Sequence, residues 1–72
     1  MTVYSKRIEA AERVELRHWL RERGIEPAEG QEYKDTVKLV RQVLSAGGDP
    51  MEIMDRGKAK IDKEIAEQKT NF

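Results

Sequence analysis

Histidine and cysteine are the residues from which a small reaction centre is most often built, and this chain offers a single one. His18 is the only histidine among 72 residues, and cysteine is absent. Catalysis through an imidazole needs a nucleophile beside it and a third group that orients the ring. The residues four positions away on the same helical face, Val14 and Glu22, do not form such an arrangement. We expect His18 to lie at the boundary between core and water, and we predict no catalytic residue.

Metal and phosphate sites have no better support in the sequence. One histidine with scattered carboxylates matches no metal-ligand spacing, and the acidic residues near the carboxyl end lie among lysines, as on a salt-bridged helix face. Gly47-Gly48 precedes a helix start that could attract an anion, but Asp49 and Glu52 would oppose one there. The chain is therefore predicted not to be an enzyme, and to hold no metal, cofactor or small-molecule substrate.

Basic side chains form two strips that could contact a phosphate backbone. The first comprises Lys6, Arg13, Arg17 and Arg21, and the second comprises Lys34, Lys38 and Arg41. No acidic residue interrupts the first strip; its like charges repel one another, whereas counterion release on a polyanion would favour them. The first strip also lies opposite the apolar side of its expected helix, where any solvent-exposed face must lie. Nucleic-acid contact and an ordinary solvated face both remain open.

A third set of residues, near the carboxyl end, follows alternating steps of three and four, which is the spacing of a coiled-coil seam. It comprises Met51, Met54, Lys58, Ile61, Ile65, Gln68 and Phe72. One hypothesis is that this seam packs on the rest of the domain. The other is that it meets a second copy of the chain or a helix of a partner protein, where methionines give an adaptable contact. The candidate protein-binding residues are Met51, Met54, Lys58, Ile61, Ile65 and Phe72.

The elements that must position these residues are three helices, with no strand. Apolar residues recur at helical spacing and do not alternate as they do in half-buried strands. The helices are predicted at residues 4–23, 32–46 and 50–69. The fold class is therefore all-α, a small three-helix domain that covers residues 1–72.

Glycine, proline and aspartate mark the helix boundaries. Gly24 is placed to end the first helix, since glycine readily adopts the left-handed conformation found there. Gly47-Gly48 stops the second helix in the same way, and Asp49-Pro50 supplies the cap and first residue of the third. Glu52 can complete a capping box with Asp49.

The interior is expected where the apolar stripes of the helices meet. The second helix carries the cleanest stripe, comprising Tyr33, Val37, Val40 and Leu44, flanked by Thr36 and Val43. The predicted core comprises Leu16, Trp19, Leu20, Val37, Val40, Leu44 and Ile61. Gly57 lies inside the third helix, where it costs about 1 kcal/mol relative to alanine. We expect a close helix crossing, a bend or local looseness to accompany it.

Composition restricts the class of protein further. Charged residues make up 39% of the chain and apolar residues 38%, so the stripes are narrow and the core is small. A formal net charge of zero argues against a generic, strongly basic polyanion binder. No apolar run is long enough to span a membrane, and no signal peptide follows Met1. With no cysteine, these features lead us to expect a cytoplasmic protein that does not bind membranes.

Leu16, Leu20, Gly24 and Ile25 follow the spacing Leu-x3-Leu-x3-Gly-Ile, and Gly30 and the second helix come after them. With this pattern residues 14–44 resemble the SAP-type helix–extension–helix modules, whose corresponding element is Leu-x3-Leu-x3-Gly-Leu. The chain departs from the family after Gly30, because Glu32 stands where the family has lysine, and Lys34 arrives two residues late. The family's Leu-x2-Arg-Leu ending is replaced by residues 40–44. The resemblance implies a small DNA-binding unit that uses the basic ends of its two helices.

Two functions follow from these observations. The favoured hypothesis is a small regulatory or adaptor protein that binds a partner protein, or a second copy of itself, through helical surfaces. By analogy alone, accessory factors of phages or plasmids are proteins of this kind. The alternative is a SAP-like nucleic-acid-binding module that uses the two basic strips.

Overall fold

The computed structural model describes residues 3–70, and within that range it consists of three helices, the first two joined by a longer connection (residues 23–32) and the last two by a short turn (residues 46–49). The helices are α1 (Val3–Glu22), α2 (Tyr33–Ser45) and α3 (Pro50–Thr70). The predicted all-α fold is confirmed, with helix ends within one residue of those expected. The domain is elongated, with extents of 44 × 23 × 16 Å.

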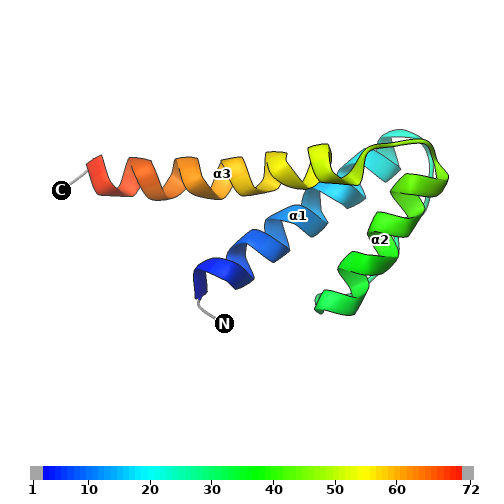
Figure 1. Cartoon of the computed structure of the whole chain (residues 1–72), viewed down its shortest axis with the longest axis horizontal. Coiled ribbons are helices and arrows are strands. Elements are labelled where there is room, and N and C mark those ends of the chain that lie inside the picture. Colours follow the sequence, from blue (N-terminus) through cyan, green and yellow to red (C-terminus); the bar gives the residue numbers. More distant parts are fainter. Residues whose placement is uncertain (1–2, 71–72) are drawn as a thin grey trace.

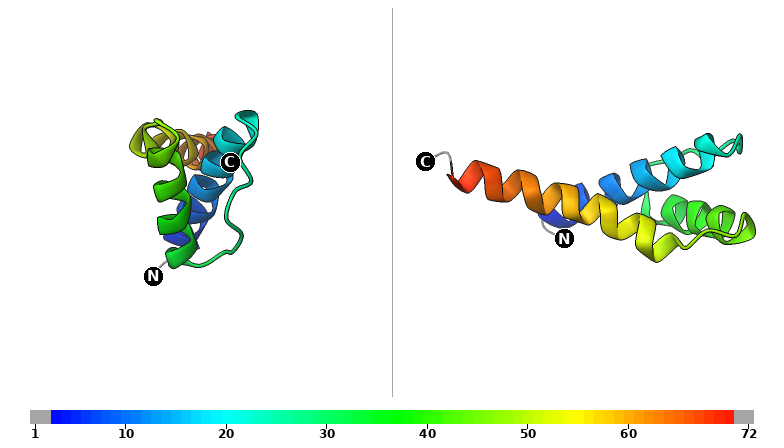
Figure 2. Two further views of the ribbon diagram at one scale, coloured as in Figure 1. Left: turned by 90° about the vertical axis from the view of Figure 1, so that its right-hand side faces the viewer. Right: turned by 90° about the horizontal axis from the view of Figure 1, so that it is seen from above.

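α1 is the central element of the fold. It packs on both other helices, most extensively on α3, whereas α2 and α3 have few contacts with each other. Figure 1 shows α2 and α3 diverging from the turn that joins them, and the two further views in Figure 2 show the same separation. The domain is thus a V of two helices held together by a third. No helix of the described chain combines the length and hydrophobicity that crossing a membrane requires.

Left-handed glycines end α1 and α2, as predicted. Gly24 has φ +73° and Gly47 has φ +82°, values that residues with a Cβ rarely adopt. Beyond Gly47 the amide of Gly48 donates to the carbonyl of Val43 at 2.9 Å, which closes the last turn of α2. The chain therefore reverses direction within a few residues and enters α3 directly.

Asp49 caps α3, which confirms the predicted helix start. Its Oδ1 accepts hydrogen bonds from the amides of Met51 at 3.1 Å and Glu52 at 3.4 Å. The carboxylate of Glu52 forms an ion pair with Arg56 at 3.1 Å, one turn further along α3. The start of α3 is thus fixed by Asp49, whereas the side chain of Glu52 pairs with the following turn of the helix.

Gly57 lies where α3 crosses α1. A Cβ at this position would lie 2.8 Å from the backbone carbon and oxygen of Ala11 and 2.9 Å from the amide nitrogen of Glu12. Of the three explanations expected for this glycine, the close helix crossing is therefore confirmed. Two ion pairs also join α1 to α3, between Arg7 and Glu64 at 2.6 Å and between Glu15 and Lys60.

The core forms where α1 meets the start of α3 and one side of α2. The buried apolar side chains are Leu16, Leu20, Leu39, Val43, Ile53 and Ile61. Three of them, Leu16, Leu20 and Ile61, belong to the predicted core. Trp19 and Val40 are partly buried against it, and Val37 is half-buried.

The predicted orientation of α2 was wrong in one respect. Leu44 was expected in the core, but it is 58% exposed, and Leu39 and Val43 are buried in its place. The buried residues Thr36, Leu39 and Val43 each precede a residue of the predicted stripe by one position, so the packing face is turned by about 100°. The apolar stripe that the sequence displays most clearly is therefore largely a surface feature.

Candidate protein-interaction surface

The central residue of the first basic strip is not on the surface. Arg13 is 6% exposed, and its Nη1 donates to Thr36 Oγ1 of α2 at 3.1 Å. A buried guanidinium needs a hydrogen-bond partner, because burying an unpaired charge is strongly unfavourable. Arg13 therefore joins α1 to α2.

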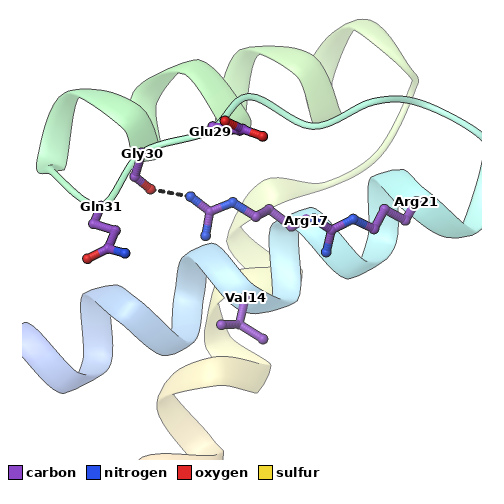
Figure 3. Close-up of a pocket in the computed structure, with 6 residues that line it drawn as sticks. All are labelled: Val14, Arg17, Arg21, Glu29, Gly30 and Gln31. Atoms are coloured by element: carbon purple, nitrogen blue, oxygen red, sulfur yellow. Dashed lines mark hydrogen bonds between the residues drawn. The ribbon is translucent and has the colours of Figure 1, made fainter.

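Arg17, the next residue of the strip, holds the connection between α1 and α2. Its Nε donates to the carbonyl of Ala28 at 3.4 Å, and its Nη2 donates to the carbonyl of Gly30 (Figure 3). Around this contact Val14, Arg17, Arg21, Glu29, Gly30 and Gln31 line an open hollow of about 470 Å³. Gln42 of α2 completes the attachment, since its amide accepts from Ala28 N at 2.8 Å and donates to a carbonyl of the connection at 2.9 Å.

The remaining basic residues are exposed, but they are divided between distant places. On α1 only Lys6 and Arg21 remain, 15 residues or about 22 Å apart along the helix. On α2 the side chains of Lys34, Lys38 and Arg41 remain on one exposed face. Lys34 lies 3.4 Å from Glu32, and Lys38 lies 3.8 Å from Asp35. The first strip is thus interrupted by internal bonds, whereas the second stays exposed, with Lys34 and Lys38 paired to acidic neighbours.

A largely apolar groove opens between α2 and α3. The residues that line it are Tyr33, Thr36, Val37, Val40, Pro50, Met51 and Met54, around a volume of about 230 Å³. Tyr33 is 69% exposed and Met51 is 66% exposed, and Leu44 continues the apolar stripe of α2. We call this set, with Leu44, the α2–α3 surface.

Local sequence explains why the groove stays open. Gly48 packs so tightly that a Cβ there would lie 2.5 Å from the ring of Trp19. This contact draws the turn onto α1, and α2 and α3 leave it in different directions because each packs on a different side of α1. The guanidinium of Arg23 also lies over the Trp19 ring, with its carbon 3.6 Å from the centroid. The apolar walls of the groove therefore diverge from the turn, and α2 and α3 have few contacts with each other.

Part of the predicted seam of α3 lies in the core, and part lies on the surface. Met51 is exposed and Met54 is half-buried, and both line the groove. Ile61 is buried within the domain and Ile65 is half-buried, while Lys58 and Gln68 are exposed. Phe72 lies outside the described residues. Ile53, which the seam omitted, is buried with Gly57 and Ile61, and these steps of four residues mark the side of α3 that packs on α1.

Charged side chains of both signs surround Glu12 of α1, on the side that faces α3. The pKa of Glu12 is raised above its ordinary value of 4.5, first by burial and then by the charges of Glu9 and Asp55, while Arg13 and Lys58 act in the opposite direction. Glu12 thus lies close enough to Asp55 of α3 for the two carboxylates to repel each other. The α3 side of the groove thus carries Asp55 and Lys58, whereas the α2 side carries Lys34, Lys38 and Arg41.

His18 is exposed and lies 2.7 Å from Glu22, one turn along α1. Within residues 3–70 no group of three or more histidine, cysteine or acidic side chains is arranged to hold a metal ion. The pairing of His18 with Glu22 has the spacing of an ordinary helix-surface pair.

Comparison of the chain with protein-family models, curated proteins and solved structures gives no match. Its function is therefore inferred from its own geometry.

Proposed function

We propose that this chain is a small, non-catalytic regulatory or adaptor module that binds a protein through the α2–α3 surface. The observation that carries the proposal is the exposure of large apolar side chains along one continuous surface: Tyr33 at 69%, Met51 at 66% and Leu44 at 58%. Isolated apolar residues on a surface are ordinary, but contiguous ones mark interaction sites.

The chemistry of this surface suits a protein partner. Burying apolar area contributes about 25 cal/mol per Å², and a methionine-lined wall adapts to the shape of the group that covers it. Tyr33 adds a rigid aromatic ring, a residue type enriched at interfaces. The small size of the chain offers a competing explanation, since small domains bury less of their surface. It does not account for the alignment of the exposed residues along a groove.

A photoreactive residue placed in the groove tests the proposal. The variant carries p-benzoylphenylalanine in place of Tyr33 and is expressed in cells of the native host. Irradiation of these cells should produce a covalent adduct, and mass spectrometry of the adduct identifies the molecule that covers the groove. The same residue in place of Val14, which is 60% exposed on another face, is the matched control. Met51→Asp and Leu44→Asp should each reduce the adduct at residue 33.

The outcomes are distinct. An adduct at residue 33 that the two aspartate substitutions abolish, with none at residue 14, supports binding at this surface. If residue 33 gives no adduct, or if residue 14 gives the same one, the α2–α3 surface is not a specific binding site.

Nucleic-acid binding is the second candidate, and the exposed strip of Lys34, Lys38 and Arg41 favours it. Titration of labelled DNA and RNA at several salt concentrations tests it, because binding through phosphates weakens steeply as salt rises. Lys34→Glu with Arg41→Glu should abolish such binding. Arg13 and Arg17 are unsuitable for this test because their substitution would disturb the fold. Binding that does not respond to salt, or to the two substitutions, would rule this candidate out.

A further inference from the structure

We propose that the occupant of the α2–α3 surface is a second copy of this chain. The two copies are paired about a two-fold axis that lies in the plane of contact and runs along the groove. α2 of each copy then lies against α3 of the other. This inference rests on the proposed function and names its partner.

The basic strip of α2 runs beside the apolar stripe. Lys34, Lys38 and Arg41 each follow a groove residue (Tyr33, Val37 and Val40) by one position. Successive residues are turned by about 100° on a helix, so the cations form a rim along the outer side of the groove. A partner that covers the apolar stripe must meet this rim as well.

Acidic residues hold the corresponding positions on α3. Glu52 and Asp55 each follow a methionine of the groove by one position, so they form the outer rim of the opposite wall. Glu52 is paired with Arg56, whereas none of the ion pairs found among residues 3–70 involves Asp55. Lys58 lies on the same side, where its charge acts on Glu12 of α1. Lys34 and Lys38 are already paired with Glu32 and Asp35. The charges of the two rims that the ion pairs found among residues 3–70 leave for a partner are therefore Arg41 on the α2 side of the apolar groove and Asp55 on the α3 side.

A two-fold axis converts this order into self-complementarity. Every contact in such a pair occurs twice with the roles exchanged. With the axis along the groove, the α2 side of each copy, which carries Arg41, meets the α3 side of the other, which carries Asp55. An axis across the groove would instead place α2 on α2 and bring two basic rims together, which is unfavourable. Charge thus selects one pairing, and the zero net charge of the chain adds no long-range repulsion.

The helix junction fixes which residues meet. Arg41 lies four residues before Ser45, the last residue of α2, and Asp55 lies five residues after Pro50, the first of α3. They are about 6 Å and about 7.5 Å from the junction along their helices. Rotation about an axis through the junction therefore brings Arg41 of one copy to Asp55 of the other.

Sedimentation equilibrium tests the pairing. The wild-type chain should change from monomer to dimer as its concentration rises from about 10 μM to about 1 mM, the range in which weak dimers form. Arg41→Glu and Asp55→Arg should each raise the dissociation constant about tenfold. Reversing the charge of either residue creates two contacts between like charges, because every contact occurs twice in a two-fold dimer. An equimolar mixture of the two variants should restore dimerisation, since each then meets its opposite.

Val14→Asp is the control and should dimerise as the wild type does. Circular dichroism verifies that the variants, both at exposed positions, keep their helices. A wild-type chain that stays monomeric over the whole range overturns the inference, as do variants that dimerise like the wild type or a mixture that does not recover. A foreign protein as the sole adduct at residue 33 overturns the second copy as occupant and leaves the proposed function standing, whereas the absence of any adduct overturns both.

Discussion

Arg13 of α1 and Thr36 of α2 form a buried hydrogen bond, with Nη1 3.1 Å from Oγ1. Both side chains are almost fully covered, and 23 residues separate them in sequence. The bond holds Thr36 towards α1, on the same face of α2 as the buried Leu39 and Val43. With this face turned inward, Tyr33 and Leu44 of the apolar stripe of α2 stay on the surface.

Removal of the hydroxyl from Thr36 should destabilise the domain. In Thr36→Val the shape of the side chain is kept, but the buried guanidinium of Arg13 loses its acceptor. We expect the free energy of unfolding to fall by about 1–3 kcal/mol, measured by urea denaturation. Thr36→Ser keeps the hydroxyl and should cost less. Equal losses in the two variants would show that packing, and not the hydrogen bond, is responsible.

Gly57→Ala should also destabilise, although alanine is the better helix former by about 1 kcal/mol. The added Cβ would meet the backbone of Ala11 at 2.8 Å, and overpacking of this kind costs about 1–3 kcal/mol. The melting temperature, followed by circular dichroism, gives the sign. Lys58→Ala, at the next and exposed position, is the control and should change it little. A higher melting temperature for Gly57→Ala would mean that the helices do not cross closely there.

Glu12→Gln should change the dependence of stability on pH. The pKa of Glu12 is raised in the fold, so its contribution is most favourable below the ordinary value of 4.5 and is lost as pH rises through the folded pKa. The neutral variant should therefore gain stability relative to wild type between about pH 4 and about pH 7. Melting temperatures across this range test the prediction, with the exposed Glu29→Gln as control for net charge. If the melting temperatures of Glu12→Gln and wild type change in parallel with pH, the prediction is wrong.

Gln42→Ala should release the connection between α1 and α2. The side chain of Gln42 bonds Ala28 N at 2.8 Å and Glu26 O at 2.9 Å, and each such bond contributes about 0.5–1.5 kcal/mol. The amide of Ala28 should exchange its hydrogen about tenfold faster in the variant, as measured by NMR. Arg41→Ala, one residue earlier and exposed, should leave that rate unchanged. If the rate at Ala28 does not rise, other contacts hold the segment.

The number, order and ends of the helices could be predicted because local residues determine them. Gly24, Gly47 and Asp49 act through backbone conformation and hydrogen bonds within a few positions of themselves. The packing face of α2 could not be predicted in the same way. α2 carries two overlapping sets of residues at helical spacing, and the choice between them depends on α1. Tyr33 and Leu44 belong to the set that a second copy of the chain is proposed to cover.

The basic strip of α1 shows a related limit. Sequence spacing places Arg13 and Arg17 on one face, but it cannot reveal that carbonyls of the connection lie within reach of Arg17. The sequence did contain a sign that a side chain would bind this connection. The segment from Pro27 to Gly30 has little regular structure, so its carbonyls need hydrogen-bond donors from elsewhere. A long cation on the preceding helix is a natural source of such donors.

The central place of α1 has a consequence for how the domain forms on the ribosome. The pairs that join α1 to α3 link residues far apart in sequence, 45 positions for Glu15 and Lys60 and 57 for Arg7 and Glu64. A nascent chain that ends before Ile53 has no partner for much of the apolar side of α1, and α2 alone covers too little of it. Stable structure should therefore arise in one late step, after the segment around Ile61 has emerged from the exit tunnel.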